Sequence, residues 1–65
     1  DSLVGERAVL TEDADSIRQT GKAVVNGQEW TVRPQDETQV IGKGELIEVV
    51  KISGVKLIVK RVKEA

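Results

Sequence analysis

Near its end the chain reads Glu45-Leu-Ile-Glu-Val-Val-Lys-Ile52, then Ser53-Gly54, then Val55-Lys-Leu-Ile-Val-Lys-Arg-Val62. Both long segments are rich in β-branched residues, which pack well on a pleated surface. A Ser-Gly pair between two such runs is typical of a tight turn. The stretch therefore predicts two strands joined as a hairpin.

The pairing of these two strands follows from the length of their loop. A two-residue loop at Ser53-Gly54 pairs Ile52 with Val55 and Val50 with Leu57. Apolar residues then lie on both faces near Val50. A bulge or strong coiling there would change which face is buried, and such kinks close small barrels.

A second hairpin is centred on Asn26-Gly27, the dipeptide most typical of a type I′ turn, which needs positive φ at both positions. The predicted strands cover residues 21–25 and 28–33. This register places Ala23 opposite Trp30 on a mostly apolar face. The other, mostly polar face comprises Lys22, Val24, Glu29, Thr31 and Arg33.

The remaining segments complete an all-β chain. Residues 3–11 are predicted as a first strand, and the acidic residues 11–16 as a loop. Residues 35–44 form the longest connection, with one helical turn at its start and Val40-Ile41 plugging one end of a barrel. The charged residues 60–65 are predicted to fray.

Five strands with one longer connection between the third and fourth are typical of a small OB-fold-like closed barrel. An SH3-like barrel is the alternative. At 65 residues the chain is expected to be a single domain, residues 1–65, cut from a longer protein. No segment approaches the ~20 apolar residues of a membrane span, so any anchor would lie outside these residues.

Composition narrows the function. Charged residues make up 32% of the chain and the formal net charge is −1. Proteins dedicated to nucleic acid usually carry a clear positive excess, so this balance argues against that partner. The sequence has no Cys and no His, which excludes disulfides, thiolate metal sites and the commonest general base. No cofactor is expected.

The polar motifs carry little chemistry. Glu12, Asp13 and Asp15 are possible cation ligands, but a calcium loop needs further oxygen ligands at set positions, so a solvated loop is favoured. Gly42-Lys43-Gly44 precedes a predicted strand rather than the helix of a phosphate-binding loop, and indicates a turn. The serines fall in loops or at the terminus, and the strand lysines alternate outward. We therefore expect that the chain is not an enzyme.

Two further features have competing interpretations. Trp30 is either a base-stacking platform or, as its face favours, a core residue whose indole N–H finds a partner. A basic strip either contacts phosphates or lipid head groups or, as the balancing acids favour, keeps a sheet edge soluble. The strip comprises Lys51, Lys56, Lys60, Arg61 and Lys63.

Four motifs follow one another along the chain: Leu3-Val4-Gly5, Gly21-Lys-Ala-Val-Val-Asn-Gly27 with Glu29-Trp-Thr-Val32, Ile41-x-Lys43-Gly44-x-x-Ile47-x-Val49-Val50, and Ile52-x-Gly54-x-x-Leu57-x-Val59. Their order resembles the soluble C-terminal domain of the NfeD family over nearly the whole chain. One departure is that Ile17-Arg18-Gln19 stands where many members have a Leu-x-Pro step.

The resemblance implies a five-stranded OB-fold barrel from a membrane-anchored parent, some relatives of which also carry a ClpP-like serine protease domain. It implies partnership with a stomatin- or flotillin-like membrane scaffold protein. No catalytic residue of the family falls on these positions. The expected function is a non-catalytic protein-interaction module on the cytoplasmic side, and the alternative is a nucleic-acid-binding OB-fold domain.

One face is predicted as part of a docking surface. Val24 is an outward apolar position among charged and polar neighbours, namely Lys22, Glu29, Thr31 and Arg33. The alternative is a single exposed valine, which needs no functional explanation.

Overall fold

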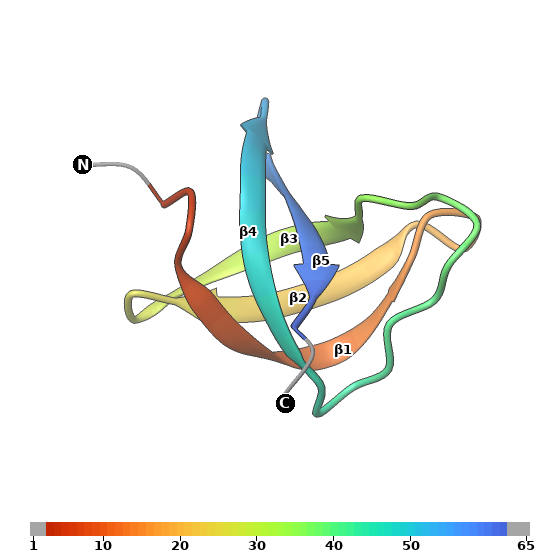
Figure 1. Ribbon diagram of the computed structural model, residues 1–65, viewed down its shortest axis with the longest axis horizontal. Coiled ribbons are helices and arrows are strands. Elements are labelled where there is room, and N and C mark those ends of the chain that lie inside the picture. The colour runs from red at the N-terminus through yellow and green to blue at the C-terminus, as the bar shows by residue number, and fades with distance from the viewer. Residues whose placement is uncertain (1–2, 63–65) are drawn as a thin grey trace.

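The computed structural model describes residues 3–62 and shows five strands that close into one barrel (Figure 1). The strands are β1 (Arg7–Asp15), β2 (Thr20–Val25), β3 (Gln28–Pro34), β4 (Leu46–Ser53) and β5 (Lys56–Arg61). Their order around the barrel is β1-β2-β3-β5-β4, and β4 pairs with β1 to close it. Every pair is antiparallel except β3 with β5. The expected all-β, OB-fold-like closed barrel is confirmed.

Alternation along the strands sends aliphatic side chains into the barrel. The buried hydrophobic residues of the core are Leu10, Ala14, Ala23, Val25, Val32, Ile41, Ile47, Val49, Leu57 and Val59. Trp30 is partly buried and packs against this core, as its face predicted. Its indole N–H, however, is buried without an acceptor within residues 3–62, so the expected hydrogen-bond partner is missing.

The β2–β3 hairpin has the predicted register. Val25 pairs with Gln28 and Ala23 with Trp30. Asn26 has φ 52° and Gly27 has φ 78°, the positive values that a type I′ turn requires. This dipeptide therefore places the hairpin faces as expected.

The predicted register of the β4–β5 hairpin is wrong. Ser53 pairs with Lys56 and Ile52 with Leu57, so the loop is Gly54-Val55 rather than Ser53-Gly54. Gly54 has φ 61°, which fits a type II′ turn with Gly at its first central position. A register shift between Val49 and Lys51 is the expected bulge, and beyond it Val49 pairs with Val59, both buried.

The acidic segment predicted as a loop forms the second half of β1. Asp15 pairs with Thr20 across two register shifts, and Ala14 between the carboxylates is fully buried. The inward side chain of Ala14 is the only buried one in this acidic part of β1, and it anchors the segment in the sheet. The strand begins at Arg7 rather than residue 3, because the chain makes a turn at Gly5, where φ is 92°.

Gly21, in β2, is packed closely between Ala14 of β1 and Val32 of β3. Its φ is 135°, a conformation that side chains rarely adopt. A Cβ at this position would collide with the carbonyl oxygen of Val32 and come within 3.0 Å of the Cα of Ala14. Only glycine fits this crossing.

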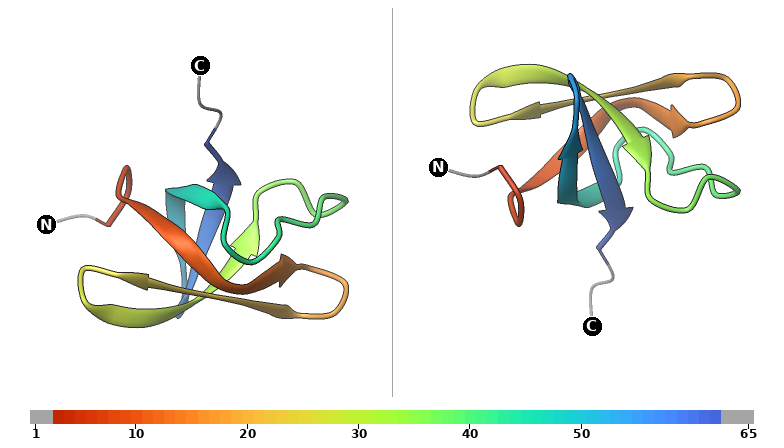
Figure 2. Two further views of the ribbon diagram at one scale, coloured as in Figure 1. Left: turned by 90° about the horizontal axis from the view of Figure 1, so that it is seen from below. Right: turned by 90° about the horizontal axis from the view of Figure 1, so that it is seen from above.

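Residues 35–45 run down the same side of the barrel as the β1–β2 turn (Figures 1 and 2). They contain bends and turns, but not the predicted helical turn. Ile41 is fully buried and bridges to Ala14, which confirms it as a plug, whereas Val40 is 51% exposed and does not plug the barrel. The predicted fraying from residue 60 is wrong as far as Arg61, which belongs to β5, and residues 63–65 lie outside the described chain.

Candidate functional site

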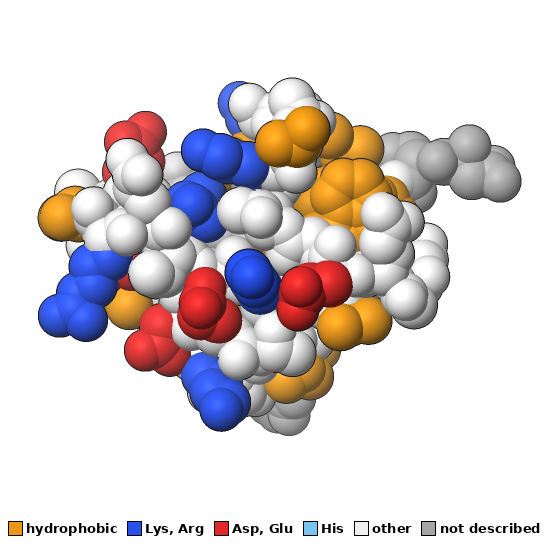
Figure 3. Space-filling view, turned by 180° about the vertical axis from the view of Figure 1, so that it is seen from behind, with side chains coloured by type: hydrophobic (Ala, Val, Ile, Leu, Met, Phe, Trp, Pro, Cys, Tyr) orange, Lys and Arg blue, Asp and Glu red, His pale blue; other side chains and the backbone are white. Residues whose placement is uncertain are grey.

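The predicted docking residues lie together on the outer face of the β2–β3 hairpin. Lys22 pairs with Thr31 and Val24 with Glu29, so their side chains share one face of the sheet. Val24 is 48% exposed, and Lys22 and Glu29 are exposed. Figure 3, which views the side where β2 and β3 lie, shows acidic and basic side chains interspersed there, with apolar ones more numerous toward the right of the view.

Arg33, the fifth of these residues, is held in place at the margin of this face. Its Nη1 donates to the carbonyl of Val32 and its Nη2 to the carbonyl of Gln19, each at 2.8 Å. Gln19 presents that carbonyl from the β1–β2 turn with φ 58°. The guanidinium therefore links β3 to the turn, and its charge has a defined position.

A groove of about 460 Å³ adjoins Arg33 and extends over the outer face of β5 and β4. Its basic residues are Arg33, Lys51 and Lys56, and its one acidic residue is Glu37. Pro34, Val50 and Ile58 supply apolar surface. The volume lies in the range of ligand-binding clefts, about 300–1,000 Å³.

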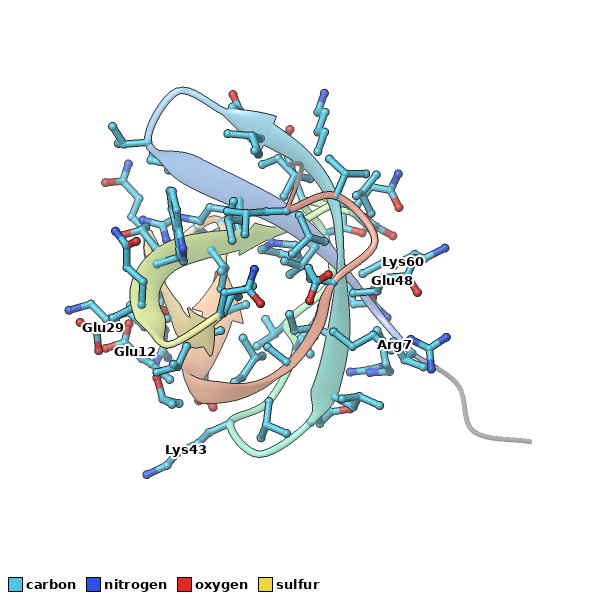
Figure 4. The ribbon with its side chains drawn as sticks, turned by 90° about the vertical axis from the view of Figure 1, so that its left-hand side faces the viewer. Arg7, Glu12, Glu29, Lys43, Glu48 and Lys60 are labelled. Carbon is cyan, nitrogen blue, oxygen red and sulfur yellow. The ribbon has the colours of Figure 1, made fainter. Side chains whose placement is uncertain are left out.

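Sequence reasoning missed this groove. It assigned Lys51 and Lys56 to a continuous basic strip, but the structure divides that strip. Lys60 lies opposite Glu48, which also pairs with Arg7 at 3.3 Å (Figure 4). Arg61 forms an ion pair with Glu45 at 2.7 Å. Lys63 lies outside the described residues.

The carboxylates considered as cation ligands bind backbone amides instead. Glu12 Oε1 accepts from the N–H of Gly21 at 2.8 Å. Asp13 Oδ1 accepts from Lys43 at 2.6 Å, and Asp15 Oδ1 accepts from Ile17 at 2.9 Å. Within residues 3–62 no group of three or more potential metal ligands occurs. These acids therefore connect the ends of β1 and β2 to the segment before β4.

The Gly42-Lys43-Gly44 segment is a turn, as predicted, and its first N–H donates a hydrogen bond to a carboxylate. Glu45 Oε2 accepts from the N–H of Gly42 at 2.7 Å. This hydrogen bond, followed by the interaction with Arg61, lowers the pKa of Glu45 below its usual 4.5.

Asp36 closes the turn after β3 in a similar way. Its Oδ1 accepts from the hydroxyl of Thr38 at 2.6 Å and from the N–H of the same residue at 2.9 Å. These hydrogen bonds lower the pKa of Asp36 below its usual 3.8. Both carboxylates are therefore most useful to the fold in their charged form.

Known proteins were compared with the chain at the level of sequence and of structure. Residues 1–61 match the family described as the NfeD-like C-terminal, partner-binding domain. No curated protein matches the sequence. Within residues 3–62 the structure has no helix that is long and apolar enough to cross a membrane.

The solved structures with the same fold include two that cover almost the whole chain. One is the soluble domain of a membrane protein implicated in regulation of membrane protease activity from Corynebacterium glutamicum. It is 36% identical, with a TM-score of 0.82, over 97% of this chain and 94% of that one. The other is the C-terminal domain of the stomatin operon partner protein 1510-C from Pyrococcus horikoshii. It is 29% identical, with a TM-score of 0.80, over 95% of this chain and 91% of that one.

Proposed function

This chain belongs to the NfeD family of C-terminal, partner-binding domains, and on that premise we propose that it acts with a stomatin- or flotillin-like membrane scaffold protein. In this proposal it is a non-catalytic interaction module of a membrane-anchored protein and lies on the cytoplasmic side. The similarity to a domain of a stomatin operon partner supports the choice of partner. The similarity to the soluble domain of a membrane protein supports the anchored parent.

The observation that carries the proposal is how the polar groups are distributed. The described core is aliphatic throughout, and within residues 3–62 no polar or charged residue is buried in it; the one buried polar side-chain atom without a partner is Nε1 of Trp30. Acidic groups around the end of β1 are engaged by backbone amides. The parts of the barrel left available for contact are its outer strand faces, which is what a rigid recognition module requires.

We assign the docking surface to the outer face of the β2–β3 hairpin. Its residues are Lys22, Val24, Glu29, Thr31 and Arg33. Lys22 and Glu29 make no ion pair with any residue in the described range 3–62, so both charges are free to pair across an interface. Val24 between them offers an apolar contact, and interfaces combine such a contact with a polar surround.

The test is a titration of the ¹⁵N-labelled domain with the soluble domain of a stomatin-family protein, followed by NMR. We expect the largest amide shift changes on β2 and β3. Val24→Lys should weaken binding, because it places a solvated charge where the partner's surface must be desolvated. Val40→Lys is the matched control, since Val40 is 51% exposed and lies in the segment before β4 rather than on the sheet that carries Val24.

Two outcomes would reject the proposal. The first is the absence of any shift change with stomatin-family domains of several sources at millimolar concentration. The second is saturable binding of single-stranded oligonucleotides with changes on the same face, which would support the nucleic-acid alternative. Equal loss of binding in the Val24 and Val40 variants would reject the assigned surface while leaving the partnership standing.

A further inference from the structure

The groove beside the docking surface has an excess of positive charge in a chain whose net charge is −1. Arg33, Lys51 and Lys56 supply this charge from three neighbouring strands. Thr31 pairs with Lys56 in the parallel β3–β5 ladder, and Lys51 pairs with Ile58 in the β4–β5 hairpin. The three cations are thereby brought to one face by pairings that are distant in sequence.

None of these cations is neutralised by the protein itself. Within residues 3–62 the ion pairs involve Arg7, Arg18 and Arg61, but not Arg33, Lys51 or Lys56. Lys51 and Lys56 are exposed, whereas Arg33 is fixed by its two backbone acceptors. The groove therefore presents one pre-positioned and two adaptable donors to an anionic ligand, opposed by the single carboxylate of Glu37.

The uncharged lining distinguishes between anionic ligands. None of the residues that line the groove is aromatic, and Trp30 packs against the core instead. Single-stranded nucleic acid obtains much of its binding energy by stacking bases on aromatic side chains, which this groove lacks. Val50 and Ile58 offer half-buried aliphatic surface between the cations, which fits a branched aliphatic side chain.

We propose that this groove binds an extended acidic peptide segment of the partner, with an aliphatic side chain placed against Val50 and Ile58 and flanking carboxylates on Arg33, Lys51 and Lys56. The proposal rests on the interaction function above and specifies the chemistry of the recognised segment. Charge complementarity is the physical basis, since it directs encounter and sets register. A charge-assisted hydrogen bond from the N–H groups of Arg33 that Val32 and Gln19 leave unused would give the strongest single contribution.

The probe is the blocked peptide Glu-Glu-Val-Glu-Glu, titrated into the ¹⁵N-labelled domain at low salt. We expect amide shift changes at the groove residues and a loss of affinity on raising the ionic strength to about 0.3 M, where the Debye length is only about 6 Å. The peptide Lys-Lys-Val-Lys-Lys should cause no change at these positions. A peptide in which the valine is replaced by serine should bind more weakly than the parent.

Reversing the charge of groove lysines tests whether the acidic peptide binds in the groove. The variant Lys51→Glu/Lys56→Glu should lower affinity by about tenfold or more. The matched control is Lys43→Glu/Lys60→Glu, which changes the net charge equally at two side chains that do not line the groove and that extend into solvent (Figure 4). The control should bind within about twofold of the parent. Circular dichroism establishes that each variant is folded, and Lys51→Gln/Lys56→Gln replaces any variant that is not.

The outcomes separate this proposal from the function on which it rests. A stomatin-family domain that binds with equal affinity to the parent and to the Lys51→Glu/Lys56→Glu variant would overturn the groove and leave the interaction function intact. Failure of the acidic peptide to shift any groove residue would also overturn it. An oligonucleotide that displaces the peptide, or equal loss of affinity in both charge-reversal variants, would show that the groove recognises negative charge without selecting a peptide, and would overturn the proposal as stated.

Discussion

The acidic end of the barrel and the basic groove use their charges in opposite ways. At the acidic end, Glu12, Asp13 and Glu45 each accept a hydrogen bond from a backbone N–H. At the groove, the side chains of Lys51 and Lys56 form no ion pair or hydrogen bond with residues 3–62. The carboxylates therefore stabilise the fold, whereas the lysine side chains are available to bind another molecule.

The difference shows why an almost neutral chain can still recognise charge. A net charge of −1 suggests a surface with no preference for charged partners. The carboxylates at the acidic end are, however, fixed beside loop amides, and the only acidic residue that lines the groove within residues 3–62 is Glu37. Local charge at a contact face therefore follows from which groups the fold has already engaged.

At the acidic end, a substitution of Gly21 should cause the largest loss of stability. We expect Gly21→Val to cost about 3 kcal/mol or more, because the new side chain must displace the carbonyl of Val32 and abandon φ 135°. Urea unfolding followed by Trp30 fluorescence measures the loss. Gly27→Ala is the control, because φ is 78° there but no atom lies within 4 Å of the added Cβ, so a cost of about 1 kcal/mol is expected. Similar losses in both variants would contradict the close crossing.

Glu12→Ala tests whether a carboxylate at the acidic end is structural. It leaves the N–H of Gly21 without its acceptor, and we expect a loss of about 1–2 kcal/mol in the free energy of unfolding. Glu29→Ala removes a carboxylate of the outer β2–β3 face and should change stability by no more than about 0.5 kcal/mol. If the two substitutions cost the same, the contrast between engaged and free charges is wrong.

Acid should lower the stability of the fold through Glu45 at the acidic end and through Asp36 in the turn after β3. Hydrogen bonds lower the pKa of both groups in the folded state, so their stabilising contribution is present above the usual values of 3.8 and 4.5 and is lost as pH falls through the folded values. We expect the urea midpoint to be level near neutrality and to fall below about pH 5. Asp36→Asn/Glu45→Gln should have a lower midpoint near neutrality and a shallower fall. An unchanged acid profile in that variant would place the pH dependence elsewhere.

The groove should show the smallest effect on stability. Lys51→Gln/Lys56→Gln removes two exposed charges that have no internal partner, so the free energy of unfolding should change by about 0.5 kcal/mol or less. The same unfolding experiment provides the measurement. A loss above about 1.5 kcal/mol would mean that these lysines belong to the architecture after all.

The parts of the fold that local sequence determines were predictable. Asn26-Gly27 allows essentially one turn geometry, so the β2–β3 register and its outer face followed from it. Gly54 did not determine the second hairpin in the same way, because one glycine can occupy either central position of a loop. The type II′ turn places it first, which moves the pairing along the strands.

The remaining errors have a common cause in long-range packing. Ala14 holds the acidic segment in β1 only because Ile41 and Gly21 lie across from it, which no local pattern reveals. The groove likewise depends on the parallel pairing of β3 with β5, which brings Arg33 beside Ile58. Strand alternation could place the five predicted docking residues on one face, but it could not show which other strand would lie beside them.

The position of β5 between β3 and β4 has a consequence for biosynthesis. As the chain leaves the ribosome, β1 to β4 emerge before β5, the strand that pairs with both β3 and β4. Until translation has passed Arg61, the facing margins of β3 and β4 have no partner and the barrel cannot close. A stalled or prematurely terminated product therefore exposes two unsatisfied edges at once, which makes it a natural client for chaperones and proteases.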